Sequence, residues 1–404
     1  MSHLTSNIDT IPPQTRLSVT DLKLRAELLL PDIAQGSAER ERERKLPYEQ
    51  IQRLAEARLL TFRIPKHYGG SGSTVREAVQ FIIDVAAFDS NIAQALRPGF
   101  LFIEGLLARS SEEERKLWFS RYLAGQVVGN AGWEIGGANG AVATRIVRDG
   151  EYFRVNGSKY YSTGGLYSDW ICAVALDEND HSVFFILPRN REGLELIDDF
   201  DAMGQRLTAS GTTHLNNVIV YPEEILPRGL NDENKRSIVT PFAQIFLGAV
   251  EAGIARNVLR DAVHFVQEKA RPIKHSTAQR SVDDPYVQHA VGEISARAFA
   301  AEAAILRAAE SIDAAWDAEL DEAAVNHAAV QVARAQFIAV ESALKAAERL
   351  FDVGGASTTG RAHNFDRHWR NARTVANHNP RDWKAAAVGA FHLKDEQLPL
   401  SGLF

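Results

Sequence analysis

Hydrophobic and polar positions divide the chain into three regions, and the first, residues 18–125, has the pattern of helices. Ser18 precedes Asp21 in the S-x-x-D arrangement of a capping box and opens an apolar-periodic run. A long apolar stretch that begins at a threonine follows over residues 74–107. The run Ser-Ser-Glu-Glu-Glu-Arg from Ser110 then predicts the start of a further helix. The first region is therefore expected to form a helical domain.

The second region, from residue 126 to about residue 227, changes to a period of two with frequent turn residues. Residues 142–147 alternate, and the pairs Asp149-Gly150 and Asn156-Gly157 are typical of turns. Runs over residues 169–176 and 182–187 have the apolar composition of strands. A region of about a hundred residues with this pattern predicts a β domain, either a small barrel or a sandwich.

The third region, from residue 240 onward, returns to helical periodicity. Three long alanine-rich stretches, residues 249–267, 285–315 and 322–351, are amphipathic and contain little glycine or proline. Their lengths fit an antiparallel four-helix bundle that residues 381–393 complete. The expected fold class is α+β, with an N-terminal helical domain, a middle β-barrel domain and a C-terminal four-helix bundle. The expected domain ranges are residues 1–125, 126–232 and 233–404.

Composition and charge argue against several classes of protein. The 404 residues are 45% hydrophobic and 24% charged, and the net charge of −7 argues against a nucleic-acid partner. The single cysteine, Cys172, excludes an intrachain disulfide and a cysteine-based metal cluster, and we expect no metal site. It lies in an apolar run that favours a buried thiol. No stretch approaches the roughly 18 apolar residues of a membrane span, and no signal peptide is visible, so we expect a cytoplasmic protein without membrane contact.

Three segments resemble motifs of one enzyme family. The segment Gly-Trp-Glu-Ile-Gly-Gly-Ala-Asn from Gly132 resembles a Thr-Glu-Pro-x-Ala-Gly-Ser-Asp loop that covers a flavin. The segment Asn-Gly-Ser-Lys-Tyr-Tyr-Ser-Thr-Gly from Asn156 resembles an Asn-Gly-x-Lys-x-x-x-Thr-x-Gly strand, and residues 202–226 resemble the segment that closes a β domain. Their order and spacing resemble those of the acyl-CoA dehydrogenase superfamily. The resemblance covers nearly the whole chain and implies an acyl-CoA dehydrogenase-like fold.

The catalytic base of a dehydrogenase is missing where the resemblance would place it. In the dehydrogenases the segment that matches residues 370–380 ends in a Tyr-Glu-Gly-Thr-like motif, and its glutamate takes the α-proton of the substrate. Here the matching positions are His378, Asn379 and Pro380, and an amide has no titratable base. The second family position for the glutamate falls near Ala243, in a segment without an acid.

Within the superfamily the chain resembles the flavin-dependent monooxygenases, in particular the dibenzothiophene monooxygenases and related sulfur-acquisition oxidoreductases. The resembling pieces are Lys-Ala-Arg-Pro from Lys269, Asp-Pro-Tyr from Asp284, and residues 365–374. The resemblance implies a homotetramer that receives reduced FMN from a separate NAD(P)H-dependent flavin reductase. Dioxygen would add to the flavin as a C4a-hydroperoxide, which would transfer one oxygen atom to a small organic substrate, and the related enzymes favour a sulfur-containing one. FAD is less expected, because no Phe-Gly pair follows Arg271 to hold the adenylate half of FAD for a neighbouring subunit.

The resemblance implies three catalytic residues beside the flavin. Thr163, at a strand end before two glycines, would hold the proton on flavin N5, and Ser162 is a second hydroxyl at the same strand end. His378 would hydrogen-bond or protonate the distal peroxide oxygen, a role that a near-neutral pKa suits. Without the resemblance, the strand-end hydroxyls would be read as bonded to the backbone, and His378 as a surface histidine. His368 is expected to be structural.

Further residues are implied to bind the cofactor. Asn130, Trp133 and Glu134 occupy the loop over the flavin, where Trp133 is alternatively a core aromatic and Glu134 a solvated charge. Arg271 is the candidate for the flavin phosphate, because its planar guanidinium matches a phosphate dianion, and its alternative role is a surface ion pair. The remaining cofactor candidates are Thr163, Gly354, Gly355 and Arg370. The two glycines permit close backbone approach to a cofactor, or else they mark a helix C-terminus.

The sequence leaves the substrate unidentified and two other functions open. The dibenzothiophene monooxygenases have an active-site histidine in the segment matching residues 89–100, where this chain has Arg97, Pro98 and Gly99. An FAD-dependent acyl-CoA dehydrogenase with an unrecognised base and a non-catalytic flavin-binding protein are the two other functions considered. The missing glutamates count against the first, and the polar residues at the flavin edge count against the second.

Overall fold

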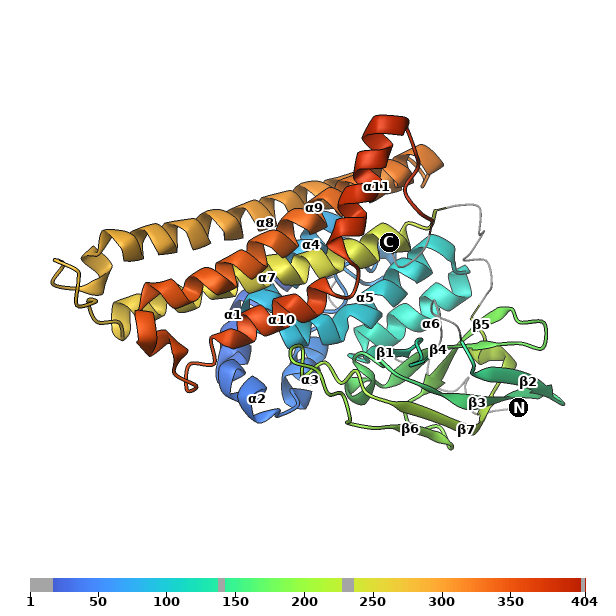
Figure 1. The fold of residues 1–404 in the computed structure, drawn as a ribbon. Helices are drawn as coiled ribbons and strands as arrows, with labels where there is room; N and C mark the ends of the chain where they lie inside the picture. Colours follow the sequence, from blue (N-terminus) through green and yellow to red (C-terminus); the bar gives the residue numbers. More distant parts are fainter. Residues whose placement is uncertain (1–16, 137–141, 227–235, 401–403) are drawn as a thin grey trace.

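The computed structural model describes residues 17–136, 142–226, 236–400 and 404. N-terminal helices, a curled sheet and a layer of long helices follow one another along the chain, and the sheet lies at one end of the long helices (Figure 1). This order of helices, strands and helices confirms the expected α+β fold class.

The N-terminal helices begin at the capping residues that the sequence indicates. Ser18, Thr74 and Ser111 each accept a hydrogen bond from the backbone three residues later, and each forms a complete capping box. The helices are α1 (Val19–Ala34), α2 (Ser37–Glu43), α3 (Tyr48–Glu56), α4 (Val75–Phe88), α5 (Ser90–Arg109) and α6 (Glu112–Leu123).

The apolar stretch over residues 74–107 forms two helices rather than one. The break falls at Asp89, whose backbone is extended with φ −154° and ψ 104°. Its side chain accepts a hydrogen bond from the Asn91 backbone N–H at 3.1 Å and pairs with Arg40 at 3.1 Å. A capping side chain satisfies the free N–H groups of a new helix, so local polar chemistry divides a run that hydrophobic periodicity leaves continuous.

The middle region forms one curled seven-stranded sheet within the described residues. Strand β4 pairs along its length with β5, while its other edge pairs with β1 and, at one position only, with β2. The order β1-β4-β2-β3-β7-β6 continues from there. The strands are β1 (Val128–Ala131), β2 (Arg145–Asp149), β3 (Tyr152–Lys159), β4 (Trp170–Leu176), β5 (Ser182–Pro188), β6 (Leu194–Leu196) and β7 (Thr213–Val220).

One of the two expected turns is a bulge instead. Asp149-Gly150 forms the turn between β2 and β3, but Asn156-Gly157 lies inside β3, where the register with β7 shifts. A Cβ atom on Gly157 would lie 2.3 Å from the Thr144 hydroxyl oxygen, so glycine is required there by a close approach. The strand therefore continues towards Thr163 instead of reversing.

The C-terminal region is built on α7 (Val239–Glu268), α8 (Pro285–Asp317) and α9 (Glu322–Arg349), with the shorter α10 (Asp366–Ala376) and α11 (Arg381–Lys394) after them. The N-terminal helix α4 packs against α7 and α8, and α10 packs against α7 and α9. Residues 381–393, expected to complete the bundle, form α11, which packs against α9 and keeps only Lys384 fully buried. Helix α7 is long and apolar enough to span a membrane, but 89% of its apolar window is buried, as in a core helix.

Candidate active site

A cavity of about 650 Å³ lies between the sheet and the helices, in the size range of roughly 300–1,000 Å³ typical of ligand sites. Four segments line it: β1 with the stretch after β3, helix α5, the loop between β6 and β7, and the end of α10. Aromatic side chains and amides dominate its wall. The lining residues used below are Gln94, Arg97, Asn130, Trp133, Thr163, Asp201, Gln205, Thr208, Ser210 and His378.

Three hydroxyls form a directed chain in the cavity wall. Thr208 Oγ1 donates its only hydrogen to the Gln205 carbonyl at 2.9 Å. Ser210 Oγ, 2.7 Å from Thr208 Oγ1, must therefore donate to Thr208. Thr163 Oγ1 then has two acceptors for its hydrogen, Ser210 Oγ at 2.9 Å and, farther away, the Tyr161 carbonyl at 3.4 Å. The lone pairs of Thr163 Oγ1 are consequently available to accept a hydrogen bond from a ligand in the cavity.

Three amide oxygens in the cavity wall have no hydrogen-bond partner among the described residues. They are Asn130 Oδ1, Gln94 Oε1 and Gln205 Oε1, and all three atoms are buried. A buried unpaired acceptor costs about 1–3 kcal/mol, so such a group indicates a partner that the protein itself does not provide. A flavin ring has N–H donors and apolar faces, and these acceptors together with Thr163 fit it.

His378 lies beside Arg97, and the contact between them indicates which ring nitrogen carries the proton. Arg97 Nη1 lies 3.4 Å from His378 Nε2. Because a guanidinium only donates hydrogen bonds, Nε2 accepts, and the neutral ring carries its proton on Nδ1. Although the side chain of His378 is exposed to the cavity, the protein atoms packed around the ring and then the charge of Arg97 lower its pKa to about 3. The pKa of His378 thus lies below the near-neutral value expected from the sequence, and the ring is neutral at physiological pH.

The position matching the dehydrogenase glutamate holds a structural amide. Asn379 is buried, and its Nδ2 donates to Gln244 Oε1 at 2.5 Å. Ala243, at the second family position, is also buried. Asp201 is the one carboxylate among the described residues that line the cavity, and it is exposed. The described lining therefore contains no buried carboxylate that could take a proton from carbon, as the dehydrogenase glutamate does.

Asn130, Trp133, Thr163 and His378 come together around the cavity, whereas Ser162 and Glu134 do not line it. The Ser162 hydroxyl is buried and accepts a hydrogen bond from Thr213 at 2.7 Å.

Glu134 binds the chain after β1 to β3, so it is not a solvated charge. Its carboxylate accepts hydrogen bonds from Lys159 at 2.5 Å and from the Thr144 hydroxyl at 2.7 Å. Burial alone would raise the pKa of Glu134, but these donors and two backbone N–H groups lower it to about 2.

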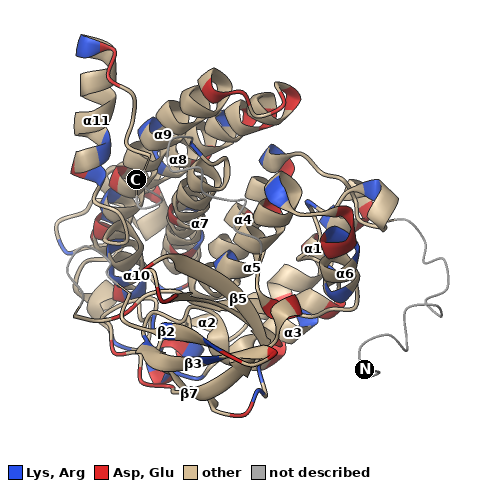
Figure 2. Cartoon of the chain, turned by 90° about the vertical axis from the view of Figure 1, so that its right-hand side faces the viewer, with Lys and Arg blue, Asp and Glu red and all other residues tan. Residues whose placement is uncertain are grey.

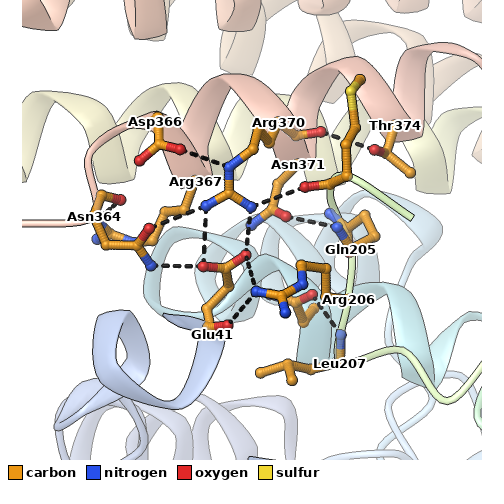
Figure 3. Close-up of polar contacts among 12 residues, drawn as sticks. Glu41, Gln205, Arg206, Leu207, Asn364, Asp366, Arg367, Arg370, Asn371 and Thr374 are labelled. Carbon is orange, nitrogen blue, oxygen red and sulfur yellow. Dashed lines mark hydrogen bonds and ion pairs between the residues drawn. The ribbon is translucent and has the colours of Figure 1, made fainter. Parts of the chain in front are cut away.

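Arg370 lies in a polar network that joins α2, α10 and the loop after β6 (Figure 3). Its Nη1 donates to Glu41 Oε1 at 2.7 Å and to the Met203 carbonyl at 2.8 Å, and its Nε donates to Asp366 at 2.7 Å. Nη2 also bonds Asn364 Oδ1 at 3.0 Å. These partners in its own subunit hold the arginine outside the lining of the cavity.

Arg271, Gly354 and Gly355 lie at the opposite end of the long helices from the sheet, which the α7–α8 loop and the end of α9 occupy in Figure 1. Arg271 is exposed in that loop. Gly354 approaches Phe265 so closely that a Cβ atom would lie 2.3 Å from the ring, and Gly355 has a left-handed φ of +55°. The structure does not bring these three residues to the cavity of the same subunit.

The structure also places expected structural residues. His368 is buried and lies 2.8 Å from Asp261, consistent with a packing role. Cys172 lies in β4 and is half-buried rather than fully buried as expected, and the apolar surroundings raise the pKa of its thiol to about 12. Lys and Arg are interspersed with Asp and Glu over the elements in view in Figure 2.

The sequence analysis missed several lining residues, among them Gln94, Gln205, Thr208 and Ser210. The last three lie within the segment 202–226 that was identified only as closing the β domain. Its run of polar residues just before β7 was the available indication. Gln94 gave no such indication, because it lies within the apolar pattern of α5.

Comparison with known proteins agrees with this arrangement. Acyl-CoA dehydrogenase family profiles match the chain: the N-terminal domain over residues 26–126, the middle domain over residues 134–218 and the C-terminal domain over residues 245–383. Dibenzothiophene monooxygenase of Mycolicibacterium goodii is 32% identical, over 92% of this chain and 91% of the relative. A probable FMNH2-dependent monooxygenase of Pseudomonas putida is 29% identical, over 96% of both chains.

Solved structures show the same fold. FMN-bound dibenzothiophene monooxygenase of Paenibacillus sp. A11-2 has a TM-score of 0.89 at 26% identity, covering 95% of this chain and 100% of that one. Methanesulfinate monooxygenase of Pseudomonas fluorescens has a TM-score of 0.86 at 27% identity, covering 95% and 99%. The chain therefore belongs to the acyl-CoA dehydrogenase family and, within it, to the group that contains the dibenzothiophene monooxygenases.

Proposed function

We propose that this protein is a two-component flavin-dependent monooxygenase that uses reduced FMN and dioxygen to oxygenate a small organosulfur compound. Its relatives include an FMN-bound structure, a probable FMNH2-dependent enzyme and monooxygenases of dibenzothiophene and methanesulfinate. The reaction consumes reduced FMN, dioxygen and substrate, and yields oxidised FMN, the oxygenated product and water. When bound, the flavin supplies the electrons and activates dioxygen, while the protein provides positioning and the control of protons.

The observation that carries this proposal is the direction of the hydroxyl chain. Thr163 donates to Ser210 and so presents an acceptor to the ligand. Reduced flavin carries a hydrogen on N5, whereas N5 of oxidised flavin is itself an acceptor. A Thr163 acceptor at the cavity wall is therefore complementary to the reduced form, as a monooxygenase requires. Asn130, Gln94 and Gln205 would hold the remaining polar edge.

His378 acts in this proposal as a hydrogen-bonding group rather than a free acid. Its pKa of about 3 keeps the ring neutral, and Arg97 fixes its Nε2 as an acceptor. A neutral ring donates a hydrogen bond through Nδ1 without giving up a proton, so it would hold the transferred oxygen in place by that hydrogen bond. We retain His378 and Thr163 as the catalytic candidates. Ser162 would support the strand end through its bond with Thr213.

The two alternative functions are less well supported by the site. A dehydrogenase needs a positioned base, and Asn379 and Ala243 occupy the family positions. Asp201, exposed in the loop after β6, is the remaining carboxylate to test. A non-catalytic flavin-binding protein would not need the Arg97–His378 pair at the cavity wall.

Arg271, Gly354 and Gly355 retain a cofactor role only if the protein is the expected homotetramer. At the far end of the long helices, they would serve the flavin of a neighbouring subunit, with Arg271 beside the phosphate. Arg370 and Glu134 would act indirectly, by holding α10 and the loop after β1. A cytoplasmic location and an NAD(P)H-dependent reductase partner complete the proposal.

The test compares the affinities for reduced and oxidised FMN, measured anaerobically and aerobically. Thr163→Val removes the acceptor and is expected to weaken the binding of reduced FMN by roughly 2- to 10-fold, the effect of one neutral hydrogen bond. Ser210→Ala removes the nearer of the two acceptors of the Thr163 hydrogen and leaves only the Tyr161 carbonyl at 3.4 Å, so it should reduce the preference for the reduced form. Thr212→Val, which removes a hydroxyl bonded to Asp199, is the matched control. Equal weakening of both redox forms by Thr163→Val would remove this support for the proposal.

A further inference from the structure

Arg97 lies where two cavities meet, so its charge is available to a bound molecule. Besides the 650 Å³ cavity, it lines a second cavity of about 270 Å³ between α5 and the strands β4 and β5. Asn130 is the other residue common to both cavities. A cavity of about 150 Å³ binds benzene in a protein interior, so the second cavity is large enough for one aromatic ring or a short alkyl chain.

The wall of the second cavity is apolar and positively charged. Leu101, Phe102, Leu106 and Phe184 provide its apolar surface. The charged residues among its described lining are Arg97 and Arg109, both cations. A molecule that fits this cavity therefore has an apolar part and no positive charge.

Arg97 has no carboxylate within ion-pair distance among the described residues, unlike other half-buried arginines of the same domain. Arg40 pairs with Asp89 at 3.1 Å, and Arg63 pairs with Glu104 at 2.6 Å. Arg97 has the long contact to neutral His378, and its buried Nε has no acceptor in the described part of the chain. Burial lowers its pKa to about 10, so it remains a cation at neutral pH.

An uncompensated charge inside a protein is costly, and an anion that binds beside it recovers much of that cost. Asp201 lines the larger cavity but is exposed and forms no ion pair with Arg97. The guanidinium presents parallel N–H donors, which match two oxygens of one anionic group. The relatives named above include monooxygenases of dibenzothiophene, which is neutral, and of methanesulfinate, which is an anion.

We propose that Arg97 binds an anionic oxygen-bearing group of the substrate, such as a sulfinate or carboxylate, while the apolar part of the substrate occupies the second cavity. The inference rests on the proposed monooxygenase function and narrows its substrate to small organosulfur anions. Arg97 is then a specificity-determining residue, placed beside His378 and at the wall that both cavities share.

The binding test uses benzenesulfinate and its neutral counterpart methyl phenyl sulfone, titrated into the flavin-free protein and into the protein with oxidised FMN. Wild type is expected to bind benzenesulfinate more tightly than the sulfone, a comparison that needs no variant. Arg97→Met should weaken the binding of benzenesulfinate by roughly 10- to 100-fold, the range for a hydrogen bond to a charged group, and leave the binding of the sulfone unchanged. Arg97→Lys should retain part of the preference. Arg145→Met, at an exposed pair with Asp180, is the control for a lost surface charge.

Each contrary result has a distinct meaning. Equal binding of the sulfinate and the sulfone by wild type overturns the inference. If Arg97→Met weakens the binding of FMN but not that of benzenesulfinate, the charge of Arg97 serves the cofactor phosphate, and the inference is also overturned. Sulfinate binding that depends on Arg97, together with no oxygenated product in the presence of reductase, supports the anion site and refutes the proposed function instead.

Discussion

The polar network around Glu41 joins α2 to α10, and its contribution to stability can be predicted from its contacts. Glu41 in α2 is 1% exposed and accepts hydrogen bonds from Arg370 Nη1 at 2.7 Å and from Asn364 Nδ2 at 2.6 Å. Arg370 Nη2 adds a third at 3.2 Å (Figure 3). Glu41→Gln removes the charge and turns an amide N–H₂ towards these donors. The variant therefore leaves a half-buried guanidinium without its buried partner.

The magnitude follows from what Arg370 retains. Removing one partner of a buried ion pair costs about 3–5 kcal/mol. Arg370 keeps Asp366, the Met203 carbonyl and Asn364 Oδ1, so the lower end of that range applies, about 3 kcal/mol. The network also sets the pH dependence: burial would raise the pKa of Glu41, but the hydrogen bonds from Arg370 and Asn364 lower it. Its contribution is thus present above the unfolded pKa of about 4.3 and is lost as the pH falls through the lower folded pKa.

Urea denaturation at matched protein concentration, followed by circular dichroism, measures this loss of stability. The difference between wild type and Glu41→Gln should be constant from about pH 5 to pH 8 and should shrink below about pH 4. Glu39→Gln, an exposed change on the same helix, is the control and should shift stability by at most about 0.5 kcal/mol. A loss below about 1 kcal/mol for Glu41→Gln at pH 7 would refute the view that this network binds α2 to α10.

Three further outcomes are expected. His378→Ala should bind FMN nearly as wild type does, yet release hydrogen peroxide at the expense of product, and full coupling of NADH to product would remove its catalytic role. Burial and then the charge of Arg367 lower the pKa of His368 to about 4. The free energy of unfolding should therefore fall as the pH falls from about 6.5 to 4, and His368→Gln should flatten that slope. An unchanged slope in the variant contradicts the structural assignment of His368. Arg271→Ala should weaken FMN by about 1.5–3 kcal/mol in a tetramer, and either unchanged affinity or a monomer at micromolar concentration in sedimentation would exclude the shared site.

The sequence predicts those parts of the fold that depend on local chemistry. The capping residues Ser18 and Thr74 specify helix starts because their partners lie three residues away. The cap at Asp89 combines a local bond from the Asn91 backbone with an ion pair to the distant Arg40. The bulge at Gly157 depends on its close approach to Thr144, in another segment of the chain. The domain ranges 1–125, 126–232 and 233–404 remain predictions, and the boundary after residue 232 lies outside the described residues.

The site is predictable only as far as its motifs extend. The strand motif indicates Thr163, but the direction of its hydrogen bond depends on Ser210 and Thr208 from a separate loop. The pKa of His378 depends on Arg97 from α5, and no spacing in the sequence relates the two. The motif segment from Gly132 ends at residue 139, which lies outside the described residues.

The central claim, oxygen transfer from dioxygen to an organosulfur substrate, is tested most directly with isotopically labelled dioxygen. The purified protein is combined with FMN, a flavin reductase, NADH and either benzenesulfinate or dibenzothiophene, and the products are analysed by mass spectrometry. We expect one labelled oxygen atom to enter the product in each turnover, with the sulfinate as the better substrate. Product oxygen that comes from water, or reduction of a dye with an acyl-CoA and no reductase, would contradict it.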